Sequence, residues 1–239
     1  MPGIHIAAVC AHPDDAETLA GGTLRREVER GRRVALVDLS AGERGSRGTP
    51  QLRAEESGAA ALVLGVAHRE CLGLPDAGIG TAAAHRDHLV EALRRLRPAI
   101  VITHHPTGRH PDHDATSRLV IEAAHLAGLA NYLPGAGAPF RPSLVLHALA
   151  TLHPDPAPPA FVVDITVQWP TKLLAVRAYA SQFLPAPGTP ANALDGALES
   201  MELAARWHGR SIGVARGEGF VTAAPLAVAD LCSLVPPGD

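Results

Sequence analysis

Short, uninterrupted apolar runs alternate along the chain with longer segments in which apolar residues recur every three or four positions. The short runs are typical of buried strands, and the longer spacing is typical of helices with one buried face. The apolar runs predict strands over residues 4–10, 33–39, 68–72, 99–103, 143–148 and 161–165. The periodic segments predict helices over residues 19–30, 50–64, 84–96, 114–129, 171–183 and 197–208.

This alternation of strands and helices predicts an α/β fold, a three-layer α/β/α sandwich around a mostly parallel, Rossmann-like sheet. A length of 239 residues fits one such unit, so we expect residues 1–239 to form a single domain. Stretches rich in proline, glycine and alanine at 134–142, 153–160 and 184–196 are expected to be surface loops within that domain.

The composition narrows the class of function. Hydrophobic residues make up 46% of the chain and charged residues 19%, which supports a packed core and argues against wholesale disorder. The formal net charge is −3 and no basic stripe stands out, so we expect no nucleic-acid partner. Thirteen histidines against 3% aromatic residues point weakly to metal binding or acid–base chemistry.

Three observations bear on the cellular compartment. No segment approaches the ~20 consecutive apolar residues that span a bilayer, so we expect no membrane partner. The N-terminus lacks the basic region of a signal peptide, which predicts a cytoplasmic protein. The cysteines, Cys10, Cys71 and Cys232, are odd in number and far apart, and we expect buried, reduced thiols rather than disulfides.

The first cluster of chemically active residues follows the predicted strand at 4–10, in the sequence AHPDDAE. It places His12, Asp14, Asp15 and Glu17 where a helix-like pattern takes over. One interpretation is structural, in which the proline shapes a turn and an aspartate caps the helix. The other interpretation is a metal site with its own base, and the cluster alone does not decide between the two.

A second cluster, HHPTGRHPDHDAT, follows the predicted strand at 99–103. Sites in parallel sheets lie outside the carboxyl ends of the strands, so the two clusters are expected to converge. His12 and Asp15, together with His113, would give zinc two imidazoles and one carboxylate and leave a fourth position for water. Asp14 could then take a proton from that water, although spacing alone does not say which aspartate has which role.

The remaining histidines of this loop have weaker assignments. His110 lies three residues before His113, from where it could stabilise a developing oxyanion as an imidazolium. His104 and His105 end the strand, and one of them could orient a metal ligand through a hydrogen bond.

A third polar segment, SAGERGSRGTPQLRAEE, follows the predicted strand at 33–39 and contains a glycine-rich loop. Glu43 and Ser46 in this loop carry groups that recognise hydroxyls, and Arg53 on the next helix could point at the same crevice. The segment lacks the spacing of a phosphate-binding loop or of a dinucleotide fingerprint. This argues against a nucleotide-binding protein, which the fold alone would permit.

These segments resemble a known family. AHPDDAE with the following GGTL, GERGSRGTPQLRAEE and GRHPDHDAT resemble the three signature blocks of the LmbE-like (PIG-L type) zinc-dependent deacetylases, which remove the acetyl group from N-acetylglucosamine-containing substrates. LGLPDAGI, FVVDIT, KLLAVRAYASQF and GRSIGVARGEGF are similar to the branch that acts in bacillithiol biosynthesis. The resemblance implies deacetylation of N-acetyl-α-D-glucosaminyl L-malate, one Zn²⁺ per chain or another divalent metal, and a hexameric or trimeric homo-oligomer.

Carried onto this chain, the resemblance implies a role for each matching residue. His12, Asp15 and His113 would be the zinc ligands. Asp14 would be the general base and then the acid that protonates the leaving amine, and His110 would stabilise the tetrahedral intermediate. The substrate-binding residues would be Arg53, Glu43 and Ser46, to which we add Arg109, because a guanidinium can grip a carboxylate of the malate group.

Alternatives remain open at this point. The zinc residues would touch only the amide, so the substrate could instead be an inositol-linked mycothiol precursor, a chitooligosaccharide or a secondary-metabolite precursor. A non-catalytic, metal-dependent sugar-binding protein would keep the ligands and lose the base, and the presence of Asp14 speaks against it. The chain also has Gly196-Ala197-Leu198-Glu199 where relatives tend to have an aromatic residue, and only Phe140 and Arg141 stand out as rim candidates in the loop at 134–142.

Overall fold

The fold is described from a computed structural model, which places residues 3–149, 158–184, 192–228 and 230–231. A seven-stranded sheet has the order β3-β2-β1-β4-β5-β7-β6. The strands are β1 (Ile6–Cys10), β2 (Val34–Asp38), β3 (His68–Cys71), β4 (Ile100–His104), β5 (Leu144–Leu149), β6 (Phe161–Asp164) and β7 (Gly217–Thr222). The helices are α1 (Asp15–Glu29), α2 (Pro50–Leu64), α3 (Ala83–Leu96), α4 (Pro111–Ala127), α5 (Trp169–Arg177), α6 (Ala180–Phe183) and α7 (Asn192–Ser211).

The strand pairing confirms the predicted α/β class. The neighbouring pairs from β3 through β5 are parallel, with β1 at the centre between β2 and β4. Only β7 runs against its neighbours β5 and β6, which makes the sheet mixed. The strand β7 was not predicted, because its sequence GEGFVT carries two glycines and a glutamate, residue types that are depleted in strands.

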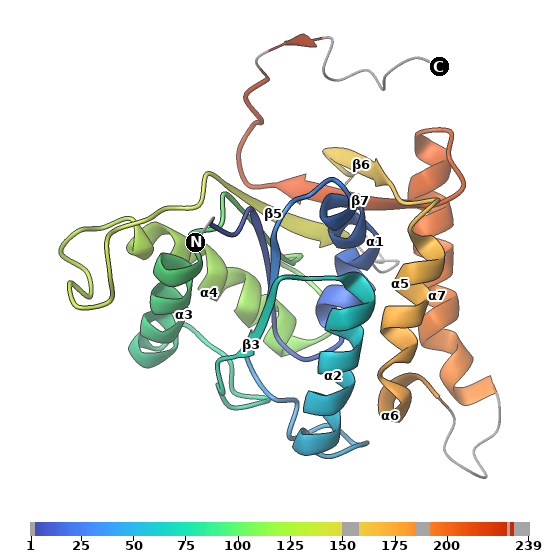
Figure 1. Cartoon of the computed structure of the whole chain (residues 1–239), viewed down its shortest axis with the longest axis horizontal. Helices are drawn as coiled ribbons and strands as arrows, with labels where there is room; N and C mark the ends of the chain where they lie inside the picture. The colour runs from blue at the N-terminus through green and yellow to red at the C-terminus, as the bar shows by residue number, and fades with distance from the viewer. Residues whose placement is uncertain (1–2, 150–157, 185–191, 229, 232–239) are drawn as a thin grey trace.

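Helices cover both faces of the sheet, as the sandwich architecture predicts (Figure 1). On one face, Ala7 and Val9 of β1 belong to the same apolar cluster as the buried residues of α3 and α4. On the other face, Ala8 and Cys10 belong to a cluster that includes buried apolar residues of α1, α2 and α5. Successive residues of a strand point to opposite faces, so one short apolar run serves both layers.

Several helices begin earlier than their apolar periodicity predicts, and the early turns of α1 and α4 lie at the candidate site. The helix α1 begins at Asp15 rather than at residue 19, and its backbone is non-helical at Ala20 (φ −140°, ψ 16°). This kink takes the first turn out of register with the apolar stripe that follows it. The helix α4 begins at Pro111, a position where proline's fixed φ favours a helix start, and not at residue 114. The predicted helix at 171–183 is divided into α5 and α6.

The structure also bears on the expectations from composition. Among the residues that the structure places, no helix combines the length and the apolar character needed to cross a membrane. Cys10 is a buried free thiol as expected, but Cys71, at the end of the edge strand β3, is exposed. Cys232 lies outside the described residues.

The packing of α7 against the start of β7 leads to a prediction about Gly209. A Cβ atom at Gly209 would lie 2.8 Å from the backbone nitrogen of Arg216 and 2.8 Å from the backbone oxygen of Val214. Backbone cannot move aside as a flexible side chain does, so we expect Gly209→Ala to lower the free energy of unfolding by about 1–3 kcal/mol. Chemical denaturation measures this change.

Gly196 in the same helix provides the matched control, since no atom of the described residues lies within 4 Å of its Cβ position. Alanine has the higher helix propensity, so Gly196→Ala should raise stability by up to about 1 kcal/mol. Equal effects of the two substitutions would show that the close approach at Gly209 is not a constraint.

Candidate metal centre

The loops that follow β1 and β4 meet at the carboxyl edge of the sheet, and the carboxylate of Asp15 lies between their histidines. Its Oδ2 lies 3.3 Å from Nδ1 of His12 and 3.3 Å from Nε2 of His104. Its Oδ1 lies 3.3 Å from Nε2 of His113, on the first turns of α4. Because β1 and β4 are parallel neighbours, residues distant in sequence converge on one carboxylate.

This environment favours the ionised form of Asp15. Burial by itself would raise the pKa of Asp15, but His113 and His104 hold it well below its usual range. The amide of Ala11 donates to Nε2 of His104 over 3.0 Å, and burial lowers the pKa of His104. Nε2 of His104 thus lies close to both the Ala11 amide and the Asp15 carboxylate, whereas His105 contacts Thr107 in its own loop.

The donor set fits a divalent transition-metal ion. The ligand atoms offered by His12, Asp15 and His113 all lie within 4.8 Å of one another. Two imidazoles and a carboxylate are the donors of many zinc sites in which one position stays open to water. A second set, His12 with His110 and Asp112, satisfies the same distance limit, but Nδ1 of His110 accepts the Asp112 amide proton and Asp112 accepts the Ala77 amide proton.

The nitrogen of His12 that faces away from Asp15 contacts two further carboxylates. Nε2 of His12 lies 3.1 Å from Oδ1 of Asp76 and 3.3 Å from Oδ2 of Asp112. A histidine that ligates metal through one nitrogen commonly gives the other N–H to a carboxylate, which fixes its tautomer and orientation. Neither carboxylate received a role from the sequence, because Asp76 is a single aspartate in the loop after β3 and Asp112 lies among the histidines of HHPTGRHPDHDAT.

Asp14, next to Asp15, has a different environment. It is the residue before the first turn of α1 and adopts a left-handed backbone conformation (φ 98°). Its Oδ2 accepts a hydrogen bond from Nη2 of Arg53 over 3.1 Å. Burial and the charge of Asp15 raise the pKa of Asp14 well above its usual range, and the Arg53 guanidinium opposes the shift. The two adjacent aspartates therefore differ in the direction of their pKa shifts.

The side chain of Arg53 is buried and hydrogen-bonded to this turn, and it does not extend into solvent. Besides Asp14, it donates to the carbonyl oxygens of Pro13 and Gly42. A Cβ atom at Gly42, whose φ is 67°, would lie 1.9 Å from Nη1 of Arg53, so only glycine fits there. In this structure Arg53 orients the candidate base and anchors the glycine-rich loop.

The other residues predicted to bind substrate lie in two loops beside the centre. Oε1 of Glu43 accepts the amide proton of Asp76 over 2.7 Å, which ties the glycine-rich loop to the loop after β3. Ser46 and Arg109 are exposed. Phe140 and Arg141 do not line this centre, because Arg141 contacts His125 at the far end of α4 and the ring of Phe140 packs under the Arg97 guanidinium.

His110 is the residue before the first turn of α4, and its ring centroid lies 4.9 Å from that of His12 and 4.8 Å from that of His113. Burial and the neighbouring His113 lower the pKa of His110. This favours a neutral ring at neutral pH and does not support the predicted imidazolium. Its Nδ1 accepts the amide proton of Asp112 over 3.2 Å, so the single proton of the neutral ring is on Nε2.

Glu17, which the sequence left without a role, lies fully buried behind the centre. Its Oε1 lies 2.5 Å from Nη1 of Arg69 and accepts the hydroxyl proton of Tyr179 over 3.2 Å. Arg69 also pairs through Nε and Nη2 with both carboxylate oxygens of Asp38. Glu17 therefore belongs to a buried ion network that joins α1 to β2 and β3, and it does not face the metal donors.

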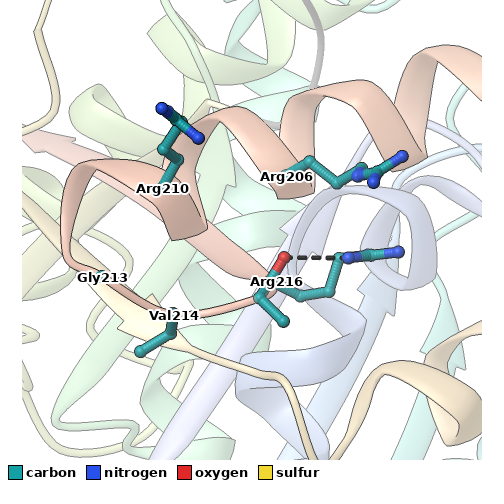
Figure 2. A pocket seen from close by; sticks show the side chains of 6 residues that line it. Arg206, Arg210, Gly213, Val214 and Arg216 are labelled. Carbon is teal, nitrogen blue, oxygen red and sulfur yellow. Dashed lines mark hydrogen bonds between the residues drawn. The ribbon is translucent and has the colours of Figure 1, made fainter.

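A separate hollow of about 450 Å³ lies at the end of α7 and in the turn before β7 (Figure 2). Its lining consists of Arg206, Arg210, Gly213, Val214, Ala215 and Arg216. Arg216 is already paired with Glu202, and no donor of the metal set contributes to the lining. The hollow is therefore distinct from the candidate metal centre.

Comparison with known proteins gives consistent results. The family model PIG-L, described as GlcNAc-PI de-N-acetylase, matches residues 7–124. The chain is 32% identical over 174 residues to "1D-myo-inositol 2-acetamido-2-deoxy-alpha-D-glucopyranoside deacetylase" of Streptomyces avermitilis. This match covers 59% of each of the two chains. The chain is 30% identical over 193 residues to "Probable N-acetyl-alpha-D-glucosaminyl L-malate deacetylase 2" of Bacillus anthracis, which covers 75% of this chain and 81% of that one. The match thus spans about three fifths of the length of the first relative and about four fifths of the second.

Solved structures share the fold over nearly the whole chain. A conserved protein from Thermus thermophilus is 36% identical with a TM-score of 0.84, over 95% of this chain and 98% of that one. The N,N'-diacetylchitobiose deacetylase from Pyrococcus horikoshii is 25% identical with a TM-score of 0.80, over 92% of this chain and 83% of that one. The 4-carboxy-2-hydroxymuconate hydratase from Pseudomonas putida is 26% identical with a TM-score of 0.75, over 95% of this chain and 100% of that one.

The contacts of His12 lead to a prediction about metal binding. Replacing Asp76 or Asp112 by asparagine keeps the size of the side chain and removes the carboxylate that faces Nε2 of His12. We expect each variant to bind Zn²⁺ about 10–100-fold more weakly, because the imidazole loses its fixed tautomer and some basicity. Competition with a chromophoric chelator measures the affinity.

Asp87→Asn is the control, since Asp87 accepts the Tyr132 hydroxyl proton and has no contact with His12. Unchanged zinc affinity in both Asp76→Asn and Asp112→Asn would contradict the orienting role of these carboxylates.

Proposed function

The chain belongs to the PIG-L family of de-N-acetylases, and from this premise we propose that it is a metal-dependent amide hydrolase that deacetylates an N-acetylglucosamine conjugate. The reaction adds water across the amide and releases acetate and a free amino sugar. The observation that carries the proposal is the convergence of His12, Asp15 and His113, with Asp14 beside them in a distinct environment.

His12, Asp15 and His113 are the residues that would hold the metal, which we propose to be one Zn²⁺ per chain. When bound, the ion would supply Lewis acidity that polarises the amide carbonyl and lowers the pKa of a water molecule. A His/His/Asp donor set also accepts other divalent ions, so the metal content of the purified protein has to be measured.

Asp14 is proposed as the group that moves protons. Its carboxylate would take a proton from the attacking water and then deliver it to the nitrogen of the leaving amine as the C–N bond breaks. The raised pKa of Asp14 suits both steps, because a carboxylate of ordinary pKa is a weak base and is seldom protonated at neutral pH. The hydrogen bond from Arg53 fixes the direction in which the carboxylate points.

His110 is proposed as the donor to the oxygen of the tetrahedral intermediate. Since its Nδ1 accepts the amide proton of Asp112, its Nε2–H is free to donate. A neutral imidazole fixed in this tautomer needs no positive charge to act as a donor to a developing oxyanion.

We propose N-acetyl-α-D-glucosaminyl L-malate, in bacillithiol biosynthesis, as the substrate. The relative from Bacillus anthracis supports this choice, and so do two exposed arginines, Arg44 and Arg109, in the loops that flank the centre. Among the described residues neither arginine side chain has a hydrogen bond or ion pair, so both are available to the carboxylates of malate. Glu43 and Ser46, with Arg53, are proposed to line the sugar site.

The main alternative is a deacetylase of another N-acetylglucosamine conjugate. The Streptomyces avermitilis relative favours an inositol conjugate, and the Pyrococcus horikoshii structure favours a chitobiose-type sugar. A cytoplasmic location and a trimeric or hexameric assembly remain part of the proposal.

Replacing the candidate base tests the reaction itself. We expect Asp14→Asn to lower kcat by at least about 100-fold, because general acid–base catalysis contributes factors of about 100 to 10,000. The variant should still bind Zn²⁺, since Asp14 is not a donor of the metal set. Acetate release and metal content, measured on the same preparation and before and after chelation, check both statements. Near-wild-type turnover would refute the assignment of Asp14.

Replacing the two free arginines tests the substrate. With the malate conjugate, Arg44→Ala and Arg109→Ala should each raise KM about tenfold or more, as expected for loss of a charge-assisted contact. With the inositol conjugate, which carries no carboxylate, KM should not change.

Arg32→Ala is the control for a general change of surface charge, because Arg32 is exposed and precedes β2 at the opposite edge of the sheet. Preferred turnover of the inositol conjugate by the wild-type protein would select the alternative substrate.

A further inference from the structure

The helix α1 is held at its kink by two side chains from other elements. The backbone departs from helical geometry at Ala20, so the first turn, which carries Asp15, and the remainder of the helix are two separate segments. Just after the kink, the amides of Gly22 and Thr23 donate to Oε1 and Oε2 of Glu218, over 3.0 Å and 2.7 Å. Just before it, the carbonyl oxygen of Thr18 accepts a hydrogen bond from Nζ of Lys172 over 2.8 Å.

These contacts engage the two backbone groups that an unbroken helix would pair with each other. In a straight α-helix the amide of Gly22 bonds the carbonyl of Thr18. Here each of these two groups has a charged side chain as its partner, and the two side chains pair with each other. Nζ of Lys172 lies 2.6 Å from Oε1 of Glu218, and both side chains are almost fully buried. An ammonium and a carboxylate thus bridge the break in the helix.

The composition of the chain sets Lys172 apart. It is the only lysine among the 21 basic residues, the other 20 being arginine. A lysine ammonium is a compact charge on a thin stem, whereas a guanidinium is a broad planar group. The stem passes closely over the kink, since a Cβ atom at Gly21 would lie 3.3 Å from Cγ of Lys172. The compact ammonium at the end of this stem reaches both the Thr18 carbonyl oxygen and the Glu218 carboxylate.

Thr18 links this ion pair to the candidate centre. Its hydroxyl donates to the carbonyl oxygen of Asp15 over 3.0 Å, and its amide donates to the carbonyl oxygen of Asp14 over 3.0 Å. The residue that Lys172 contacts is thus hydrogen-bonded to both aspartates of the centre. A rotation of the first turn about the kink would move both carboxylates relative to His12 and His113.

We propose that Lys172 and Glu218 are a positioning pair, which fixes the kink of α1 so that the carboxylates of Asp15 and Asp14 meet the metal and the reacting water. Neither residue touches the metal donors or the substrate. The catalytic part of this statement rests on the proposed function, whereas its metal-binding part does not.

The other explanation is that the pair only stabilises the fold. A buried ion pair is weak evidence for stability, yet removing one partner is strongly destabilising because the other charge is left buried. Lower stability alone is therefore expected from both explanations. The geometry of the metal centre separates them, because a purely stabilising pair would leave the centre of the folded protein unchanged.

The experiment compares Lys172→Met and Glu218→Gln with the control Arg94→Met. Arg94 is also buried, and it donates to backbone carbonyls at the far end of α4, including those of Ala127 and Leu129. The Zn²⁺ affinity of the folded protein is measured by chelator competition. The visible spectrum of the Co²⁺-substituted protein reports the geometry of the ligands. The values of kcat and KM are determined for acetate release from N-acetyl-α-D-glucosaminyl L-malate.

The expected result is specific to the pair. Lys172→Met and Glu218→Gln should bind Zn²⁺ about tenfold or more weakly, as is typical when support for a metal ligand is removed. They should also alter the Co²⁺ spectrum and lower kcat with little change in KM. Arg94→Met should lower the thermal midpoint while its zinc affinity and Co²⁺ spectrum stay those of the wild type.

Wild-type zinc affinity and an unchanged Co²⁺ spectrum in folded Lys172→Met would overturn the proposal. Should Lys172→Met fail to fold, Glu218→Gln decides by the same two measurements, because it keeps the side-chain length and a carbonyl oxygen for the helix amides. If the wild-type protein binds Zn²⁺ but releases no acetate, the proposed function fails, and the metal measurements still test the positioning role.

Discussion

The candidate centre depends on the contacts between the ionised carboxylate of Asp15 and three imidazoles. A buried carboxylate is costly unless polar or charged partners replace its lost hydration. Here imidazoles of His12, His104 and His113 surround it, and each comes from a different segment. The parallel pairing of β1 with β4, the early start of α1 and the early start of α4 all serve this convergence, because a change in any one would withdraw a partner from the carboxylate.

Two adjacent aspartates lie in different environments, which suits the separate roles proposed for them. The left-handed backbone at Asp14 turns its side chain towards Arg53, whereas Asp15 faces the imidazoles. Burial and the charge of Asp15 then raise the pKa of Asp14, while His113 and His104, acting against burial, lower the pKa of Asp15. Titratable neighbours whose pKa values are driven apart are typical of a site that needs one permanent anion and one proton carrier. The spacing HPDD could not distinguish them, because the distinction lies in the conformation of one residue.

The sequence predicted those features that follow from local pattern and from the geometry of parallel sheets. Apolar runs located six of the strands, and the rule that sites lie at carboxyl ends of strands placed His12 and His113 at one edge. Asp76 escaped detection because it is isolated in its loop and reaches His12 only through the folded arrangement of β3 beside β2. Glu218 escaped for a similar reason, since a glutamate between two glycines has no strand signature and its partner Lys172 lies 46 residues away.

The hydratase from Pseudomonas putida has the same fold, which shows that the scaffold does not by itself select the reaction. Hydration of a double bond and hydrolysis of an amide both require that water lose a proton as it attacks an electrophilic carbon. A buried centre that acidifies water and carries a proton could therefore serve either reaction, and substrate choice must come from the groups outside it. In the proposed function those groups are the exposed side chains of Arg44, Ser46 and Arg109. The loop that carries Arg44 and Ser46 is held at its base by hydrogen bonds to Arg53 and Asp76. Anchored loops with free outer side chains let the substrate preference change while the position of the carboxylates stays constant.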